Sequence, residues 1–356
     1  MPFDLNSLLR PHIKDLKPYT SARDEYSGKE GIFLDANENP LGSVTIENFN
    51  RYPDPYQTSL KVELSKIKEV DPKQVFLGNG SDEAIDLLFR AFCNPGKDNV
   101  ILLPPTYGMY EVSANINDVE VRKVSLTADF QLQPLKILEA ADHNSKILFI
   151  CSPNNPSGNK VKREDIYFLL RNFPGLVVVD EAYIDFSDEP SFTTELKNYP
   201  NLLVMQTFSK AWGLASLRLG MAFGSEEIIR ILNKIKPPYN ISGLTQDTVL
   251  HALKDKGKVD LMIKEILAER DFLELELKKL PFVEKIHPSH ANFLLVKLPH
   301  ANQVYEDLIK EKIIVRNRAK VTLCEDCLRI SVGTRSENEA FIEALAGIGK
   351  LKNLKI

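Results

Sequence analysis

Short apolar runs alternate with amphipathic segments between residues 75 and 224. The apolar runs are too short for helices and suit buried strands, which we expect at residues 75–77, 100–103, 119–124, 146–151, 176–179, 202–206 and 217–223. Residues 82–92 and 162–172 carry apolar side chains at three- and four-residue spacings, which predicts helices. Strands that are apolar on both faces and joined by helical crossovers predict an α/β fold with a mostly parallel sheet.

The pattern changes after about residue 245. Residues 245–279 place Leu and Ile at helical spacings, and a last helix is expected from about residue 337. Between them lie three strand candidates, at residues 292–296, 313–316 and 327–332. We therefore expect an N-terminal arm over residues 1–44, a large domain over residues 45–245 and a smaller α+β domain over residues 246–356.

Composition narrows the class of protein. Of 356 residues, 43% are apolar and 26% are charged, and 45 basic and 49 acidic side chains leave a formal charge of −4. These values argue against a disordered chain and a nucleic-acid-binding protein. The N-terminus lacks a signal-peptide core, no apolar run approaches a membrane span, and four cysteines are too few for a disulfide framework. We expect a reduced, cytoplasmic protein without membrane or nucleic-acid partners.

Polar residues collect where the predicted strands end. The first strand runs into Gly-Asn-Gly-Ser-Asp over residues 78–82, a glycine turn whose N–H groups open a helix and suit a phosphate. Glu83 stands where a dinucleotide fingerprint has its third glycine, and no Walker lysine follows. Later strand ends carry Asn155, Asp180, Tyr183, Ser209, Lys210 and Arg218. Ligands of open α/β sheets bind at such ends, so we expect these groups around one ligand.

The inventory of groups matches pyridoxal phosphate. The cofactor presents a phosphate, a ring nitrogen, a ring hydroxyl and a carbonyl carbon. The glycine turn with an arginine suits the phosphate, a carboxylate suits the protonated nitrogen, and an amide with a phenol suits the hydroxyl. Lys210 would form the Schiff base with the carbonyl carbon.

Three blocks resemble the conserved blocks of class-II pyridoxal-phosphate aminotransferases of fold type I. They are residues 152–158 (SPNNPSG), 179–183 (VDEAY) and 207–220 around the lysine (TFSKAWGLASLRLG). Five further motifs resemble the histidinol-phosphate aminotransferase family, at residues 34–40, 51–54, 77–83, 105–110 and 328–333. The resemblance implies pyridoxal 5′-phosphate as cofactor. It also implies amino transfer between L-glutamate or 2-oxoglutarate and imidazole acetol phosphate or L-histidinol phosphate, in histidine biosynthesis.

The resemblance assigns roles around the cofactor. Lys210 would be the Schiff-base lysine and proton carrier, and Asp180 would pair with the ring nitrogen. The ring hydroxyl would be bound by Asn155 and Tyr183, and the ring would stack on Tyr107. The phosphate would be held by Ser81, Asp82, Thr207, Ser209 and Arg218. Tyr52 would reach the cofactor phosphate of a neighbouring subunit, which implies a homodimer with shared active sites.

The resemblance also points to substrate contacts. Arg329 resembles the arginine that binds the substrate anion, and its guanidinium fork suits the phosphate of one substrate and a carboxylate of the other. Further candidates for substrate contacts are Tyr19, Arg23, Asn37, Asn240 and Arg316. Because residues 35–40 and Arg329 are expected at one site, the N-terminal arm would form part of the small domain.

Other interpretations stay open. An aromatic or broad-range aminotransferase would have the same fold. A threonine-phosphate decarboxylase of cobalamin synthesis shares these motifs and also takes a phosphorylated substrate. A non-catalytic regulator that binds pyridoxal phosphate usually carries a DNA-binding domain, and residues 1–33 are neither long nor basic enough for one.

Some conspicuous residues favour a structural interpretation. Cys324 and Cys327 have the spacing of metal ligands, but no second pair accompanies them. His287 and His290 lack a third ligand. We interpret Glu181 and Asp185, which follow the carboxylate motif without a task of their own, as structural or solvated.

Overall fold

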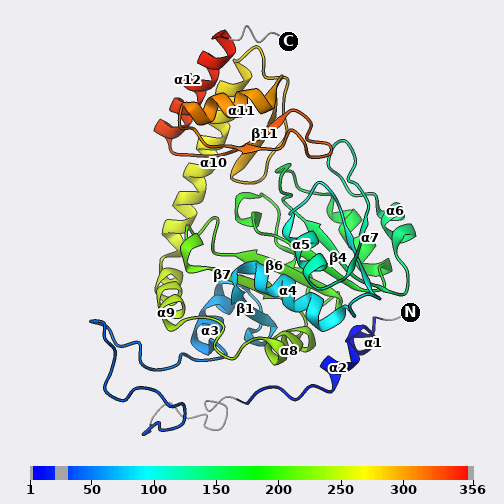
Figure 1. Cartoon of the computed structure of the whole chain (residues 1–356), viewed down its shortest axis with the longest axis vertical. Coiled ribbons are helices and arrows are strands. Elements are labelled where there is room, and N and C mark those ends of the chain that lie inside the picture. Colours follow the sequence, from blue (N-terminus) through cyan, green and yellow to red (C-terminus); the bar gives the residue numbers. More distant parts are fainter. Residues whose placement is uncertain (1–2, 21–30, 352–356) are drawn as a thin grey trace.

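A seven-stranded sheet forms the centre of the large domain in the computed structural model, which describes residues 3–20 and 31–351 (Figure 1). The strand order is β1-β7-β6-β5-β4-β2-β3. The strands are β1 Val75–Asn79, β2 Asn99–Leu102, β3 Glu120–Lys123, β4 Ser145–Cys151, β5 Leu176–Asp180, β6 Leu202–Thr207 and β7 Leu219–Phe223. Among them β7 runs antiparallel to both of its neighbours, and the remaining pairs are parallel. The predicted α/β fold with a mostly parallel sheet is confirmed.

Helices cover both faces of this sheet (Figure 1). They are α1 Leu5–Leu8, α2 Pro11–Lys14, α3 Thr58–Lys68, α4 Gly80–Phe92, α5 Met109–Ile116, α6 Pro134–Ala140, α7 Arg163–Asn172, α8 Glu226–Ile235 and α9 Gly243–Ala252. Short 3₁₀ helices connect some of these elements, at Pro72–Gln74, Ile184–Phe186, Phe192–Glu195, Ala215–Leu217 and Leu253–Asp255.

The pleat of the central strands divides the core in two. In β4, Ile147 and Phe149 pack into one hydrophobic cluster, whereas Leu148 and Ile150 pack into the cluster on the other face. Side chains alternate between the faces of a strand, so a continuous apolar run is what a sheet covered on both sides requires. The same rule explains why these strands were visible in the sequence.

The reversed strand β7 brings an additional residue to the carboxyl edge. Parallel strands end at one edge of the sheet, where ligands bind. Because β7 runs the other way, its beginning lies at that edge, and Arg218 immediately precedes it. The short segment before β7, which includes the 3₁₀ helix Ala215–Leu217, has no sequence pattern that fixes the direction of the next strand. The sequence therefore left the reversal of β7 undetermined.

The small domain is built on a four-stranded antiparallel sheet with the order β10-β11-β9-β8. Its elements are α10 Lys256–Lys278, β8 Lys285–Ile286, β9 Phe293–Lys297, α11 Ala301–Lys310, β10 Arg316–Asn317, β11 Cys327–Ser331 and α12 Arg335–Leu351. Leu294 and Val296 of β9 join the core of this domain, while Phe293 and Leu295 join a cluster of the large domain. The sheet therefore packs on its own helices with one face and turns the other toward the large domain.

In the small domain one strand prediction is corrected, and one strand, β8, was not predicted. The strand expected over residues 313–316 is wrong, because β10 begins only at Arg316 and pairs with β11 through two residues. The apolar side chains of Ile313 and Val315 pack against the small-domain core, and the N–H of Ile313 donates to the carbonyl of Leu308 at the end of α11 and not to a strand. β8 is also short and half-buried, and its two residues give no periodic signal.

The helix α10 connects the two domains (Figure 1). Val259 near its start packs into the large-domain cluster, whereas Leu273 and Leu277 pack into the small-domain core. Residues 31–50 lie beside the large domain, at the end of the molecule opposite to the small domain (Figure 1). Within one chain residues 31–50 thus do not approach Arg329, and the division of the chain into three parts stays a prediction.

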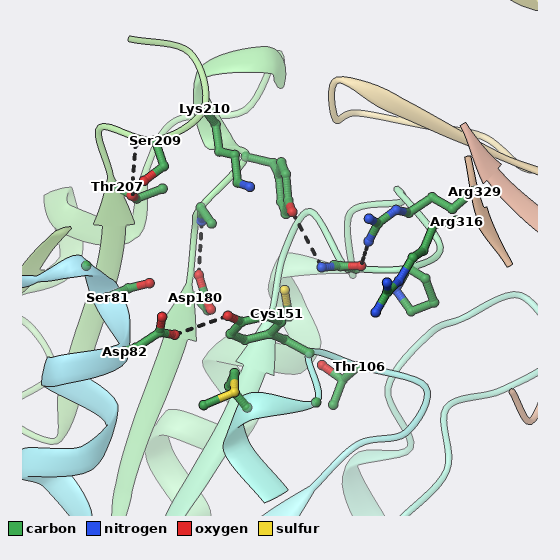
Figure 2. Close-up of a pocket in the computed structure, with 18 of the residues that line it drawn as sticks. Ser81, Asp82, Thr106, Cys151, Asp180, Thr207, Ser209, Lys210, Arg316 and Arg329 are labelled. Carbon is green, nitrogen blue, oxygen red and sulfur yellow. Dashed lines mark hydrogen bonds between the residues drawn. The ribbon is translucent and has the colours of Figure 1, made fainter. Parts of the chain in front are cut away.

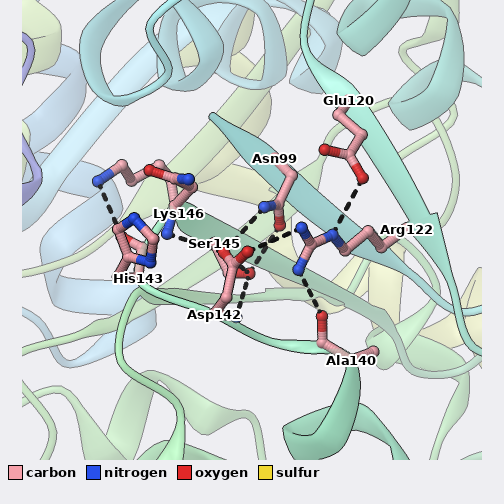
Figure 3. Close-up of polar contacts among 9 residues, drawn as sticks. Asn99, Glu120, Arg122, Ala140, Asp142, His143, Ser145 and Lys146 are labelled. Carbon is pink, nitrogen blue, oxygen red and sulfur yellow. Dashed lines mark hydrogen bonds and ion pairs between the residues drawn. The ribbon is translucent and has the colours of Figure 1, made fainter. Parts of the chain in front are cut away.

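A polar network joins the sheet at the edge opposite to the carboxyl ends of the parallel strands. Asn99 at the start of β2 donates to Oδ1 of Asp142 at 3.0 Å and accepts a hydrogen bond from Ser145 at 2.6 Å (Figure 3). Arg122 of β3 donates to the second carboxylate oxygen of Asp142 at 2.8 Å and to Glu120 at 3.0 Å. These hydrogen bonds hold the pKa of Asp142 below its usual value, the one from Asn99 contributing most. The network joins β2, β3 and β4 far from the carboxyl edge, so we assign it to stability.

None of the helices in residues 3–20 and 31–351 combines the length and the apolar character that crossing a bilayer requires.

Candidate active site

A cavity of about 720 Å³ lies at the carboxyl edge of the sheet (Figure 2). Most of the predicted site residues line it: Ser81, Asp82, Tyr107, Asn155, Asp180, Tyr183, Thr207, Ser209, Lys210, Arg218, Arg316 and Arg329. The first ten come from the large domain, and the last two come from the small-domain sheet. The cavity is therefore closed by both domains.

Asp180 is the last residue of β5 and is 3% exposed. Its Oδ2 accepts a hydrogen bond of 2.5 Å from the hydroxyl of Tyr110, and its Oδ1 accepts one of 3.0 Å from the N–H of Ala182. Burial raises the pKa of Asp180 to about 6, and the two donors oppose that rise. At neutral pH Asp180 is therefore a buried carboxylate whose two oxygens accept hydrogen bonds from neutral donors, which suits a cationic ligand atom.

Lys210 reaches into the same cavity from the loop after β6 (Figure 2). Its Nζ lies 5.5 Å from the centre of the Tyr183 ring. Burial lowers the pKa of Lys210, and the neighbouring Arg329 lowers it further. A lowered pKa increases the share of neutral amine, which is the form that attacks a carbonyl carbon or accepts a proton.

The start of α4 forms an anion cradle beside Arg218. Gly80 has φ of +71°, and a Cβ placed on it would lie 2.7 Å from Nη2 of Arg218. A Cβ on Gly220 would lie 2.2 Å from the backbone nitrogen of Ser81. The absence of both Cβ atoms lets β7 approach the first turn of α4, where unpaired N–H groups and the helix dipole favour an anion.

Three side chains complete the cradle. The hydroxyl of Thr207 donates to Ser209 at 3.0 Å and accepts from the N–H of Ser209 at 3.1 Å. Arg218 lies 3.5 Å from a carboxylate oxygen of Asp82, and the other oxygen of Asp82 accepts a hydrogen bond from Tyr107 at 3.1 Å. The Asp82 side chain thus contacts the guanidinium of Arg218 and the hydroxyl of Tyr107. The sequence led us to expect a role for the Asp82 backbone only.

The opposite part of the cavity joins the two domains. Nδ2 of Asn155 donates to the hydroxyl oxygen of Tyr183 at 3.4 Å. Oδ1 of Asn155 accepts a hydrogen bond of 2.5 Å from Arg329 of the small domain (Figure 2). Arg329 alternates with Leu328 and Ile330, which point into the small-domain core, and this alternation turns Arg329 toward the large domain.

Four predicted residues lie outside this cavity. Tyr52 is half exposed and stacks on Tyr239 with ring centres 4.5 Å apart. Tyr19 is 75% exposed, and Asn37 is exposed with φ of +52°. Asn240 donates to the carbonyl of Leu77 and to Glu83, each at 3.0 Å, which supports the end of β1. Arg23 lies outside the described residues.

Sequence reasoning missed several residues of the site. Tyr110 stands in the predicted motif at residues 105–110, but only its neighbour Tyr107 received a role. Its contact with Asp180 bridges 70 positions, so no local pattern announces it. Cys151 and Arg318 also line the cavity. Arg318 follows the candidate Arg316 by two residues, and strand alternation was the signal that would have found it.

The structural interpretation of Glu181 agrees with its contacts. The carboxylate of Glu181 is buried and accepts hydrogen bonds from Ser191, the N–H of Phe192 and Gln206. All four cysteines are free and buried. No cluster of three or more potential metal ligands occurs among the residues that the structure describes.

Comparisons with known proteins agree on one family. The family model "Aminotransferase class I and II" matches residues 29–345. A histidinol-phosphate aminotransferase of Cytophaga hutchinsonii is 54% identical over 345 residues, covering 97% of this chain and 99% of the relative. That of Parabacteroides distasonis is 53% identical, covering 99% of both. The chain belongs to the histidinol-phosphate aminotransferase family.

Solved structures support the same assignment for this aminotransferase. The histidinol-phosphate aminotransferase of Clostridium acetobutylicum has a TM-score of 0.79 and 26% identity, covering 86% of this chain and 92% of that one. The Sinorhizobium meliloti enzyme, solved in complex with pyridoxal 5′-phosphate, has a TM-score of 0.79 at 22% identity, covering 96% and 97%, and shows the shared fold. The chain is a pyridoxal-phosphate-dependent aminotransferase.

The residues present fit that cofactor. The glycine-lined cradle at the start of α4 has the shape and polarity that a phosphate needs. The buried carboxylate of Asp180 suits a protonated ring nitrogen, and the amine of Lys210 is available in the same cavity.

Proposed function

We propose that this aminotransferase exchanges an amino group between L-glutamate or 2-oxoglutarate and imidazole acetol phosphate or L-histidinol phosphate, in histidine biosynthesis. The proposal rests on one cavity that holds Lys210 and Asp180 at one end and arginines of the small domain at the other. Relatives that are 53% and 54% identical over nearly the whole chain carry the name of this activity.

We assign the cofactor contacts by the chemistry of each group. The first turn of α4 at Ser81 and Asp82, with Thr207, Ser209 and Arg218, would hold the phosphate. The carboxylate of Asp180 would bind the ring nitrogen, and Asn155 with Tyr183 would bind the ring hydroxyl. Tyr107 would stack on the ring. When bound, pyridoxal phosphate supplies an electron sink that stabilises negative charge at the substrate α-carbon.

Lys210 has two tasks in this proposal. Its Nζ would hold the cofactor covalently, and the same amine would take the proton from the substrate α-carbon and return it. Both tasks need the neutral amine. Burial and the charge of Arg329 favour that form, because they lower the pKa of Lys210.

Arg329 and Arg316 would bind the substrate anion. They are directly opposite one another in the β10–β11 pair, and both line the cavity. Guanidinium forks accept carboxylates and phosphates with two hydrogen bonds each. The hydrogen bond from Arg329 to Asn155 would be exchanged for substrate contacts on binding.

We further propose a homodimer in which each chain completes the other's site. The N-terminal arm and the residues directly after it expose large apolar side chains to solvent, namely Ile32, Leu34, Leu41, Val44 and Ile46. Exposed apolar patches of this kind are typical of protein interfaces. A second copy covering this arm would bring Tyr52 to the partner's cofactor phosphate, and Asn37 and Tyr19 to the partner's substrate.

A cytoplasmic location is part of the proposal. It is supported by the four free, buried thiols, which are typical of proteins in a reducing compartment.

The two half-reactions test the proposed function. Holoenzyme mixed with L-histidinol phosphate should change its visible absorption, and 2-oxoglutarate should restore the spectrum and yield glutamate. Initial rates with both substrates varied should give parallel double-reciprocal lines, because the amino group is carried by the enzyme between two separate steps. Absence of any spectral change with histidinol phosphate, while an aromatic amino acid produces one, would favour a broad-range aminotransferase.

A decarboxylase acting on a phosphorylated substrate remains the second candidate. An L-threonine-O-3-phosphate decarboxylase of Porphyromonas gingivalis has the same fold, with a TM-score of 0.73 at 23% identity. The arginine-lined end of the cavity suits the phosphate of either substrate. Release of carbon dioxide from threonine phosphate without any need for 2-oxoglutarate would identify this activity.

A further inference from the structure

The small domain presents three arginines to the cavity: Arg316, Arg318 and Arg329. Arg316 faces Arg329 across the β10–β11 pair, and the N–H of Arg318 donates to the carbonyl of Cys327 at 3.0 Å, which continues this pairing. Residues two positions apart in a strand share a face, so Arg318 lies on the same side as Arg316. Three cations thus converge on one wall of the site.

No ion pair neutralises this wall within residues 3–20 and 31–351. Like charges placed opposite each other in a sheet are destabilising, so the arrangement needs another reason to exist. The buried Nε atoms of Arg318 and Arg329 have no hydrogen-bond partner in the described chain. Burial lowers the pKa of Arg318, and the charges of Arg329 and Arg316 add to this effect. The wall therefore lacks a carboxylate partner among the described residues, and the Nε–H groups of Arg318 and Arg329 lack acceptors.

We propose that Arg318 is a third anion-binding arginine, which selects the phosphorylated substrate over the carboxylate substrate at the same end of the cavity. This proposal rests on the function proposed above and extends it to a residue that determines specificity.

The charges of the two anions explain the selection. A carboxylate carries one negative charge on two oxygens, and one guanidinium fork with a neighbouring cation satisfies it. A phosphate monoester carries about 1.5 to 2 negative charges at pH 7 on three oxygens. The third guanidinium supplies the remaining charge and donors, so its removal should affect the phosphate far more than the carboxylate.

The test compares Arg318→Gln with Lys320→Gln in the holoenzyme. Lys320 is exposed two residues further along and does not line the cavity, so its variant removes a nearby positive charge only. For Arg318→Gln, kcat/KM of the histidinol phosphate half-reaction should fall by about 10- to 100-fold, mostly through KM. The glutamate half-reaction should change by less than about threefold. Lys320→Gln should leave both half-reactions near the wild-type values.

Inorganic phosphate provides a probe that does not depend on turnover of histidinol phosphate. In the wild type it should compete with the amino donor, and in Arg318→Gln its inhibition constant should rise about tenfold or more. If Arg318→Gln fails to bind cofactor, Arg318→Lys replaces it, and loss of the fork at constant charge should still weaken phosphate binding. Equal losses for both substrates, or an unchanged phosphate inhibition constant, would overturn the proposal. Weaker phosphate inhibition in an enzyme that ignores histidinol phosphate would instead overturn the proposed function alone.

Discussion

Tyr110 donates its hydroxyl hydrogen to Oδ2 of Asp180 at 2.5 Å, and both side chains are buried. Tyr110 stacks on Phe149 with ring centres 4.7 Å apart, so the phenol has little freedom to turn away. Burial raises the pKa of Tyr110 well above its usual value, and the phenol remains a donor throughout the physiological range. The pair therefore favours the ionised carboxylate that a protonated ring nitrogen requires.

Replacing Tyr110 by Phe should weaken this effect. The Oδ2 atom of Asp180 would lose its donor while it stays buried, at a cost of about 1–3 kcal/mol, and the pKa of Asp180 would rise. We expect a drop in kcat of about tenfold or more, and a pH titration of the bound cofactor's visible spectrum that moves to a different midpoint. Stopped-flow kinetics and spectral titration measure these two effects.

Tyr167→Phe is the matched control for that variant. Tyr167 donates to Glu195 at 3.0 Å from a half-buried position on α7, outside the cavity. This variant should leave kcat and the spectral midpoint unchanged. A Tyr110→Phe enzyme with the wild-type spectral midpoint would show that Tyr110 serves packing alone.

Replacing Asp180 by Asn should change how the stability of the apoprotein depends on pH. Burial raises the pKa of Asp180 from 3.8 to about 6, so the folded state holds this proton more tightly than the unfolded chain. The contribution of Asp180 to stability therefore falls as pH rises from about 4 to about 6. Asn has no such titration. We therefore compare the two proteins by the unfolding free energy of Asp180→Asn minus that of the wild type. This difference should be about 1 kcal/mol larger at about pH 8 than at about pH 5.

Urea denaturation of the two cofactor-free proteins measures this difference. The isosteric amide can accept the Ala182 N–H and donate to the Tyr110 oxygen, so the packing of the site is retained. A difference between the two proteins that does not vary with pH would mean that Asp180 does not titrate in this range.

Lys210→Ala should separate folding from chemistry. Lys210 is the amine within the cavity, and its removal leaves the core of the large domain untouched. We expect normal circular dichroism, loss of the visible chromophore of the covalently held cofactor, and a loss of turnover of about 10²- to 10⁴-fold. Lys278→Ala, which removes an exposed partner of Glu274 on α10, should keep both properties. An unchanged visible spectrum in Lys210→Ala would contradict the assignment.

Gly220→Ala should damage the phosphate cradle from a position that touches no substrate. The added Cβ would lie 2.2 Å from the nitrogen of Ser81, so β7 and the start of α4 would be forced apart. We expect a loss of about 1–3 kcal/mol of unfolding free energy and weaker cofactor binding, measured by thermal denaturation and by titration with pyridoxal phosphate. Gly347→Ala in α12 meets no atom within 4 Å and should stabilise the helix by about 0.5–1 kcal/mol. Equal cofactor affinity in both variants would refute the role of the cradle.

Most of the large-domain strands were predictable because the signal is local. β4, β5 and β6 are continuous apolar runs, and each is followed directly by a motif whose residues line the cavity. Parallel strands end at one edge of the sheet, so the residues that follow them, Asn155, Asp180 and Lys210, lie close together. The edge strands β8 and β10 of the small domain were less predictable, because each contains only two residues and such a short strand has no periodic pattern.

The sequence by itself determined the fold class, the motif around Lys210 and the set of side chains that suit a phosphorylated cofactor. Tertiary structure alone decided the reversal of β7, the contact between Tyr110 and Asp180, and the arrival of Arg318 beside Arg316 and Arg329. The physical reason is the range of the interactions. Apolar periodicity and strand-end motifs are written within a few residues, whereas strand direction and contacts across 70 or more positions depend on how whole elements pack.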